Sequence, residues 1–108
     1  MSKKSNTLFF VALFLIGDPA LAAAPDAERT KELTRFVRQE CGFCHGLHLT
    51  GGLGSSLTAE ALRDKPSEPL IATTLYGIPG TAMPGWAPFL SADDASWIVN
   101  ELKKGFPK

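Results

Sequence analysis

The sequence predicts a small all-α domain. Apolar residues recur at helical spacing in several segments, and no segment shows the alternation of period two that marks a half-buried strand. Stretches rich in glycine and proline separate these segments and are typical of loops. The chain has 108 residues, which is enough for one domain at most. We therefore expect three to four helices joined by loops.

Residues 1–22 have the pattern of a secretory signal peptide. Two lysines give a positive start, residues 8–16 form an apolar run, and Ala20-Leu21-Ala22 is the small-x-small pattern read by signal peptidase. A membrane anchor would need about 20 apolar residues, whereas Gly17 ends this run far short of that length. We therefore expect cleavage after this pattern, no stable membrane insertion afterwards, and one folded domain over residues 23–108.

The charge of the chain is balanced, with 11 basic and 11 acidic residues. Such a balance gives no general attraction to nucleic acid or to an anionic membrane surface. The partners are therefore expected to be proteins or small molecules. A domain of this size also buries too little apolar surface for comfortable stability by itself, so we expect a further constraint on the fold.

The first helix of the domain is expected from about Asp26 to Cys44. Leu33 and Val37 lie one helical turn apart and belong to its apolar face. Its last turn therefore carries both cysteines of the chain. Residues 46–56 are too rich in glycine for a regular element, and they favour a loop whose backbone can approach a flat or bulky group.

Two shorter helices are expected next. A helical turn can start at Thr58 and must end at Lys65-Pro66, because proline is poorly tolerated inside a helix. A further helix is expected to begin at Ser67, whose hydroxyl would cap it. Gly77 stands where a left-handed cap would end that helix.

The last part of the chain predicts a loop followed by a closing helix. Residues 77–86 hold three glycines and two prolines, which favour a rigid and sharply turned loop. Ser91 followed three residues later by Asp94 is a capping signature. The helix after it carries Ile98 and Leu102 on one apolar face.

Cys41, Cys44 and His45 form a C-x-x-C-H motif, the signature of a covalently attached haem c. Residues i and i+3 share a helix face, so both thiols can form thioethers at one porphyrin edge, and the histidine can bind the iron from one side. Two other chemistries remain open. A redox dithiol usually opens a helix after a strand, and zinc usually needs a second, distant pair of ligands. The sequence offers neither context, which favours one covalently bound haem c.

A second axial ligand of the iron is expected from Met83, the only methionine of the expected mature chain. A lone methionine more often fills a gap in the core, but Pro79 and Pro84 stiffen the loop around this one and can hold its sulfur in place. His48 is a rival ligand, although it would have to reach around the porphyrin edge. Trp86 could wall the haem or donate its N–H to a propionate.

Four segments, CGFCHG, GGLG, GIPGTAMPGW and LSADDASWIVNELKK, resemble class I c-type cytochromes, and the likeness extends over almost all of the expected mature chain. More narrowly, CGFCHGLHLTGGLGSSLTAEAL and LYGIPGTAMPGWAPFLSADDASWIV are similar to the cytochrome c55X family. These are small periplasmic monohaem cytochromes associated with the haem-c and haem-d nitrite reductase of denitrifying bacteria. The resemblance implies a periplasmic location and the cytochrome c fold, in which the N- and C-terminal helices cross and the helices wrap around one covalently bound haem.

The resemblance also implies roles for individual residues. Cys41 and Cys44 would attach the haem through thioethers, and His45 and Met83 would be the axial iron ligands. In the wider family, a proline after the glycine loop offers its carbonyl to the ring N–H of the axial histidine. Here Ser55 stands at that position. A serine carbonyl can accept the same bond, although the loop loses a fixed φ angle.

These features imply an electron carrier and not an enzyme, because two strong axial ligands leave no open site at the iron for oxygen or peroxide. The expected partners are nitrite reductase, as acceptor in denitrification, and an upstream donor. An accessory role in maturation of haem d is the alternative, and weak peroxidase activity after loss of Met83 is a third possibility. We expect a monomer whose partner docks over an apolar rim at the haem edge. The residues of this rim are Leu47, Leu53, Ile78, Ala82 and Pro84.

Overall fold

The structure, a computed structural model, describes residue 12 and residues 24–107. The expected leader, residues 1–22, lies outside the described residues except for Ala12, so the signal peptide and its cleavage site stay predictions. In the described part of the chain, no helix combines the length and the apolar character that crossing a membrane requires.

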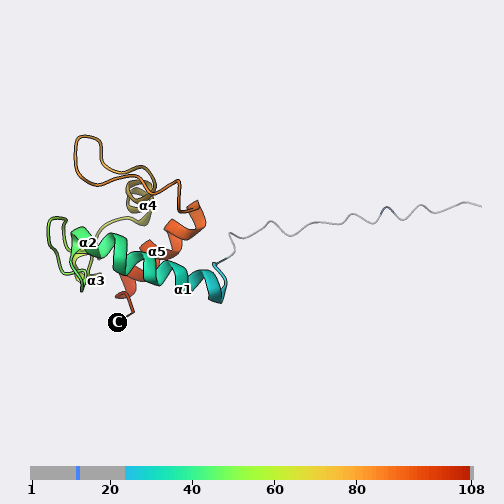
Figure 1. Ribbon diagram of the computed structural model, residues 1–108. Helices are drawn as coiled ribbons and strands as arrows, with labels where there is room; N and C mark the ends of the chain where they lie inside the picture. Colours follow the sequence, from blue (N-terminus) through green and yellow to red (C-terminus); the bar gives the residue numbers. More distant parts are fainter. Residues whose placement is uncertain (1–11, 13–23, 108) are drawn as a thin grey trace, which may run out of the picture.

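Residues 24–107 form helices and loops, without any strand. The elements are α1 (Ala27–Phe36), a π-helical turn η1 (Val37–Cys41), α2 (Gly42–His45), α3 (Ala59–Leu62), α4 (Ser67–Tyr76) and α5 (Ala92–Lys104) (Figure 1). The all-α prediction is therefore confirmed.

The predicted first helix is present, but it is not a uniform α-helix. Asp26 caps α1 by accepting a hydrogen bond from the Arg29 amide at 2.8 Å. The helix then widens by one residue per turn in η1, where the Gly42 amide donates to the Val37 carbonyl. Such π turns are often found at functional sites. Here the wider turn ends at Cys41, so it sets the direction from which the C-x-x-C-H motif leaves the helix.

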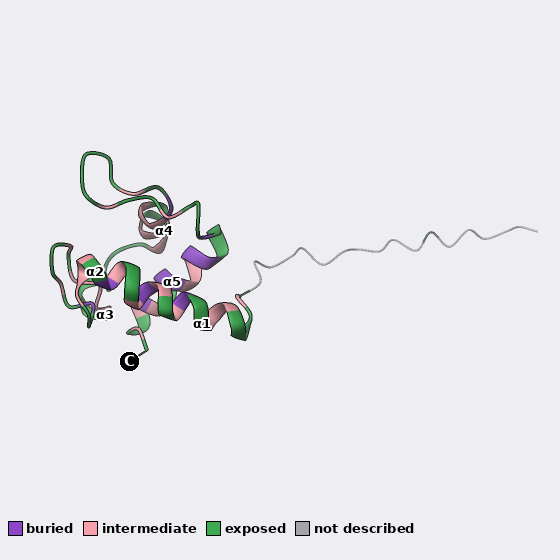
Figure 2. Cartoon of the chain, viewed as in Figure 1, coloured by how far each residue is buried: buried purple, intermediate pink, exposed green. Residues whose placement is uncertain are grey.

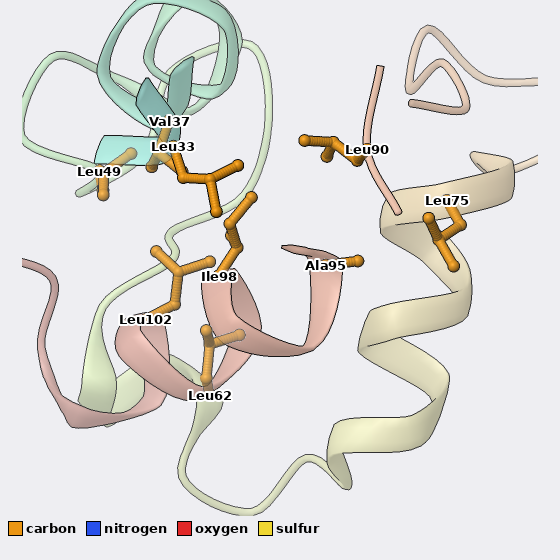
Figure 3. Close-up of a cluster of buried hydrophobic side chains, with 9 residues drawn as sticks. All are labelled: Leu33, Val37, Leu49, Leu62, Leu75, Leu90, Ala95, Ile98 and Leu102. Atoms are coloured by element: carbon orange, nitrogen blue, oxygen red, sulfur yellow. The ribbon is translucent and has the colours of Figure 1, made fainter. Parts of the chain in front are cut away.

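The hydrophobic core lies where α1 and α5 cross (Figure 1). Leu33 points toward Ile98 of α5 (Figure 3). Val37 and Leu102 belong to the same cluster, and all four side chains are less than a tenth exposed. The crossing of the N- and C-terminal helices was predicted and is confirmed. Leu49, Leu62, Leu75 and Leu90 extend the same cluster from the loops and short helices. Figure 2 shows that buried residues concentrate at this crossing, whereas the two long loops are mostly exposed.

The cap of α5 agrees with its sequence signature. Ser91 Oγ accepts a hydrogen bond from the Asp94 amide, and Asp94 Oδ2 accepts one from the Ser91 amide, each at 3.0 Å. Likewise, Thr58 Oγ1 accepts from the Ala61 amide at 3.2 Å at the start of α3. These reciprocal and single caps satisfy amides that have no partner inside their helices.

The predicted cap of α4 is wrong. Pro66 is the N-cap residue and contributes no side-chain hydrogen bond, while Ser67 is already the first helical residue. The extended backbone of Pro66 ends the preceding turn, so the hydroxyl of Ser67 lies one position too late to cap. At the other end, Gly77 has the expected positive φ of 72°, but its ψ of −170° is not left-handed helical. The chain therefore leaves α4 in an extended direction.

Candidate haem site

Both cysteines of the motif lie at the end of the first helical segment. Cys41 is the last residue of η1, Cys44 lies in α2, and both are of intermediate exposure and not joined by a disulfide. Burial, with the negative charge of Glu40 as a smaller contribution, raises the pKa of the Cys41 thiol to about 11. At neutral pH this thiol is therefore protonated, which disfavours its reaction as a free thiolate.

His45 is held by its neighbouring loop. Its Nδ1 lies 2.6 Å from the carbonyl oxygen of Ser55. Because a carbonyl can only accept, Nδ1 must carry the proton, and in the neutral ring Nε2 keeps its lone pair. This is the state that a metal-binding histidine requires. The prediction that a serine carbonyl replaces the family's proline carbonyl is therefore confirmed in geometry.

The glycine loop closes tightly over the motif. The Gly51 amide donates to the His45 carbonyl at 2.8 Å, and the Gly54 amide donates to the Cys44 carbonyl at 2.7 Å. A Cβ atom at Gly54 would lie 2.7 Å from Nδ1 and Cε1 of the His45 ring, closer than real contacts allow. Only glycine lets the backbone lie this near the imidazole.

Met83 lies in a second loop that is closed at its base. The amides of Trp86 and Ala87 donate to the carbonyls of Thr74 and Leu75, each at 3.0 Å, so the returning chain is fastened to α4. Inside the loop, the Ile78 amide donates to the Met83 carbonyl at 3.2 Å. Met83 is half-buried and does not belong to the hydrophobic core cluster. The competing interpretation, a methionine that fills the core, therefore finds no support.

The base of this loop depends on the absence of side chains. A Cβ atom at Gly77 would lie 2.6 Å from the Met83 carbonyl oxygen and 2.8 Å from the Gly85 amide nitrogen. A Cβ atom at Gly85 would lie 2.8 Å from the Leu75 carbonyl oxygen. The segments that enter and leave the loop can approach one another only because both positions are glycine.

The remaining residues singled out in the sequence have other surroundings. His48 is exposed in the glycine loop. Trp86 is partly buried and packs edge-on against Phe36 with ring centroids 5.0 Å apart, and the centroid of the Phe89 ring lies 6.1 Å from that of Trp86. Trp86 thus joins α1 to the end of the methionine loop. Its proposed contact with a haem propionate is not tested by this packing.

Arg29 contributes an arrangement that the sequence did not reveal. Its Nη2 donates to Asp94 Oδ2 at 2.7 Å and to the Phe89 carbonyl at 3.2 Å, and its Nε donates to Asp94 Oδ1 at 3.3 Å. Hydrogen bonds to Asp94 and Glu32 raise the pKa of Arg29 above its usual value. The guanidinium in turn holds the pKa of Asp94 below its usual range. Since 65 residues separate Arg29 from Asp94, no local pattern marks the pair.

The surroundings of the two loops fit an apolar macrocycle. In the view of Figure 1, both loops extend on the side away from the start of α1. Six large apolar side chains are exposed among the described residues, and all lie in these loops or beside them. They are Phe43, Leu47, Leu53, Tyr76, Ile78 and Phe89. Two thiols, a histidine with a free Nε2, a thioether and exposed apolar side chains together form a donor set suited to haem c.

The two loops also lack charge. Residues 41–59 and residues 69–92 contain no Lys, Arg, Asp or Glu. The ionised side chains of the described chain lie instead in and beside the helices, from Asp26 to Glu40, from Glu60 to Glu68 and from Asp93 to Lys104. The zinc alternative gains no support, because no group of three or more His, Cys, Asp or Glu side chains in the described part of the chain is arranged to hold a metal ion.

Comparisons with known proteins identify relatives of the chain. Residues 28–100 match the family described as cytochrome c oxidase, cbb3-type, subunit III. Cytochrome c55X of Stutzerimonas stutzeri is 53% identical over 98 residues, which are 91% of this chain and 87% of the relative.

Two solved structures are similar to the chain. A c-type cytochrome NirC has 59% sequence identity and a TM-score of 0.73, and the match covers 74% of this chain and 94% of the other. The dihydro-heme d1 dehydrogenase NirN, solved in complex with DHE, has 32% identity and a TM-score of 0.62, and the match covers 68% of this chain but only 16% of NirN.

These relationships decide between the chemistries that the cysteine motif left open, in favour of one covalently bound haem c. The redox dithiol and the zinc site are thereby set aside. The chain is a member of the c-type cytochromes, and within them it belongs to the cytochrome c55X family.

Proposed function

We propose that the protein is a periplasmic one-electron carrier in which Cys41 and Cys44 hold the haem by thioether bonds, while His45 and Met83 bind the iron from opposite sides. The observation that carries this proposal is the 2.6 Å hydrogen bond from His45 Nδ1 to the Ser55 carbonyl. It fixes the tautomer and the ring plane, and it leaves Nε2 to the metal. When bound, the haem supplies a single iron centre that accepts and releases one electron.

The protein side chains select electron transfer over other haem chemistry. With His45 and Met83 both bound to it, the iron would keep no open position for oxygen or peroxide. Methionine sulfur favours the reduced metal, so the loop that holds Met83 raises the reduction potential. The chain itself then moves no protons and forms no bond to a substrate, which is why we assign it no enzymatic activity.

The axial and covalent bonds have direct tests. Protein exported to the periplasm should have the mass of the chain after leader removal plus one haem, and its ferric form should show the weak far-red absorption band of iron bound to thioether sulfur. Met83→Leu should remove this band while the haem stays attached. Retention of the band in Met83→Leu would exclude Met83 as the ligand, and a mass without added haem would exclude the site.

We propose nitrite reductase as the electron acceptor, with the partner docking over the apolar rim at the haem edge. Leu47 and Leu53 are 79% and 92% exposed, and Ile78 is about half exposed. Exposed apolar side chains around a redox site suit a small, short-lived contact. The reduced protein should therefore be reoxidised rapidly when mixed with nitrite reductase and nitrite in a stopped-flow experiment.

Ile78→Asp is the matched test of this docking surface. An ionised carboxylate would have to be desolvated in the contact, so reoxidation by the partner should slow on the order of tenfold while the absorption spectrum stays unchanged. Glu60→Gln, on α3 and outside the rim, is the control and should react like the wild-type protein. Equal rates for Ile78→Asp and wild type would remove this face as the docking site.

An accessory role in the maturation of haem d is the second candidate. The observation that favours it is the similarity to the dihydro-heme d1 dehydrogenase NirN over 68% of this chain. In this case, deletion of the gene should leave nitrite reductase without its haem d, and reoxidation of the carrier by complete nitrite reductase should be slow. An electron donor predicts the opposite pair of results.

A further inference from the structure

Arg29 lies between the two parts of the molecule that hold the candidate axial ligands. It belongs to α1, and the same run of helix continues through η1 into α2, where His45 is located. Its guanidinium reaches the Phe89 carbonyl, which follows the methionine loop, and the Asp94 carboxylate, which caps α5. One side chain therefore connects the histidine side of the site to the end of the segment that carries Met83.

The contact of Arg29 with Asp94 and Phe89, called the joint below, has a specific geometry. The side chain of Asp94 is 10% exposed, and both of its oxygens accept from Arg29, so the planar guanidinium is held in a two-point geometry. Asp94 Oδ2 is also the acceptor for the Ser91 amide in the capping box. The carbonyl of Phe89 receives a third hydrogen bond, at 3.2 Å, from the same side chain. A lysine could not make these three bonds at once, because its ammonium has no planar fork.

The backbone between Met83 and this joint is short and already turned. The amides of Phe89 and Leu90 both donate to the Trp86 carbonyl at 2.9 Å, so residues 86–90 form a compact turn. This turn connects the Phe89 carbonyl, six residues after Met83, to Trp86 at the base of the loop. Trp86 itself packs on Phe36 of α1. This is a second contact, besides that of Arg29, between the first helix and the end of the methionine loop.

We propose that Arg29 is a positioning residue for Met83, which holds the end of the methionine loop to the first helix and so opposes release of the sulfur from the iron. The inference rests on the proposed ligation by Met83. Without Arg29, the hydrogen bonds that close the base of the loop on α4 remain, and the helical core is unchanged. The loop then keeps its fold but has one anchor fewer, so the sulfur leaves the metal more often.

The experiment is a titration of the ferric haem protein with imidazole, which competes with the methionine sulfur and abolishes the far-red band. Arg29→Met keeps the apolar stem and removes the three hydrogen bonds to Asp94 and Phe89, together with the exposed one to Glu32. Its apparent affinity for imidazole should rise on the order of tenfold, and its reduction potential should fall. Arg29→Lys, which keeps the charge and one bond, should lie between Arg29→Met and wild type.

Two controls separate positioning from general stability. Glu32→Gln removes only the exposed 2.8 Å ion pair of Arg29 and should bind imidazole like wild type. Ile98→Val weakens the core of α5 without touching the joint, and it should lower the unfolding midpoint but not raise the imidazole affinity.

Three results would overturn the proposal. If Arg29→Met binds imidazole as wild type does, the joint does not hold the loop. If Ile98→Val tightens imidazole binding as much as Arg29→Met, the effect is loss of stability and not of position. If the wild-type protein has no far-red band at all, the ligation by Met83 fails, and the positioning role fails with it.

Discussion

The two candidate axial ligands are held in different ways. His45 is fixed by its own side chain, through the bond from Nδ1 to Ser55 ten residues away, and by the glycine loop that lies against its ring. Met83 has no such side-chain anchor, because a thioether cannot donate a hydrogen bond. It is placed by the closure of its loop on α4 and by the contacts of Phe89 and Trp86 with α1.

This difference teaches which ligand is permanent and which can be released. The histidine side is built from one short stretch of sequence, so it can form as soon as that stretch folds. The methionine side needs contacts between residues more than 40 positions apart, so it depends on the complete tertiary structure. Changes on the histidine side should therefore abolish the haem protein, whereas changes on the methionine side should leave the haem attached and free one face of the iron.

Gly54→Ala should have the largest effect, because it acts on the histidine side. Its Cβ would lie 2.7 Å from the imidazole and must displace the ring from the Ser55 carbonyl. We expect little or no haem-loaded protein, measured as haem absorbance per mass of protein. Ser55→Ala keeps the carbonyl and should load normally. Normal loading of Gly54→Ala would show that the ring is less constrained than its packing indicates.

Gly77→Ala should break the methionine side alone. The new Cβ would meet the Met83 carbonyl at 2.6 Å at a backbone φ of 72°, so the base of the loop must open. We expect full haem loading but loss of the far-red band of the ferric protein. Gly80→Ala is the matched control, since φ is 77° there but no atom lies within 4 Å of the added Cβ. A persistent band in Gly77→Ala would contradict the role of this closure.

Asp94→Asn should have an intermediate effect on stability that depends on pH. Arg29 holds the pKa of Asp94 below its usual value, so the ionised carboxylate stabilises the folded state above about pH 4, and this contribution is lost as pH falls through the lowered pKa. At pH 7 the variant should lose about 1 to 2 kcal/mol of unfolding free energy, and the difference from wild type should shrink below about pH 4.

Chemical denaturation across this pH range checks the prediction for Asp94. Asp93→Asn, at an exposed neighbouring position in the same first turn, is the control, and it should change the unfolding free energy by only about 0.5 kcal/mol. A difference between Asp94→Asn and wild type that stays constant down to pH 2 would mean that the charge is not what stabilises the joint.

Ser55→Pro should have the smallest effect, and it should stabilise the loop that holds His45. It restores the proline found in the wider family and keeps the carbonyl that accepts from His45. Among the described residues, the backbone amide of Ser55 donates no hydrogen bond, so the substitution removes none. By restricting the unfolded chain, the substitution should raise the unfolding free energy by about 0.4 to 1 kcal/mol, with unchanged spectra. A fall in stability would mean that the φ angle of Ser55 does not suit proline.

The sequence predicted those parts of the fold that depend on local patterns. The caps at Thr58 and Ser91 and the loop around Met83 follow from residues within a few positions of one another. The replacement of the proline carbonyl by that of Ser55 was instead predicted from the resemblance to class I c-type cytochromes. Ser67 shows the limit of this approach, since the extended Pro66 moved the start of the helix by one residue.

Two features could not be predicted because their causes are not local. The π turn of η1 adds one residue to a turn without disturbing the apolar spacing of Leu33 and Val37, so the pattern fits a plain α-helix equally well. The joint at Arg29 depends on residues 60 and 65 positions away, which meet only after α5 has packed on α1. Arg29, which we infer to position Met83, therefore belongs to no sequence motif.

The absence of ionised side chains from residues 69–92 has a consequence for how the carrier meets other molecules. Long-range attraction and repulsion depend on charge, and residues 69–92 contribute none. Its encounters should therefore proceed at the rate of unsteered diffusion, about 10⁵ to 10⁶ M⁻¹s⁻¹, and change little with ionic strength.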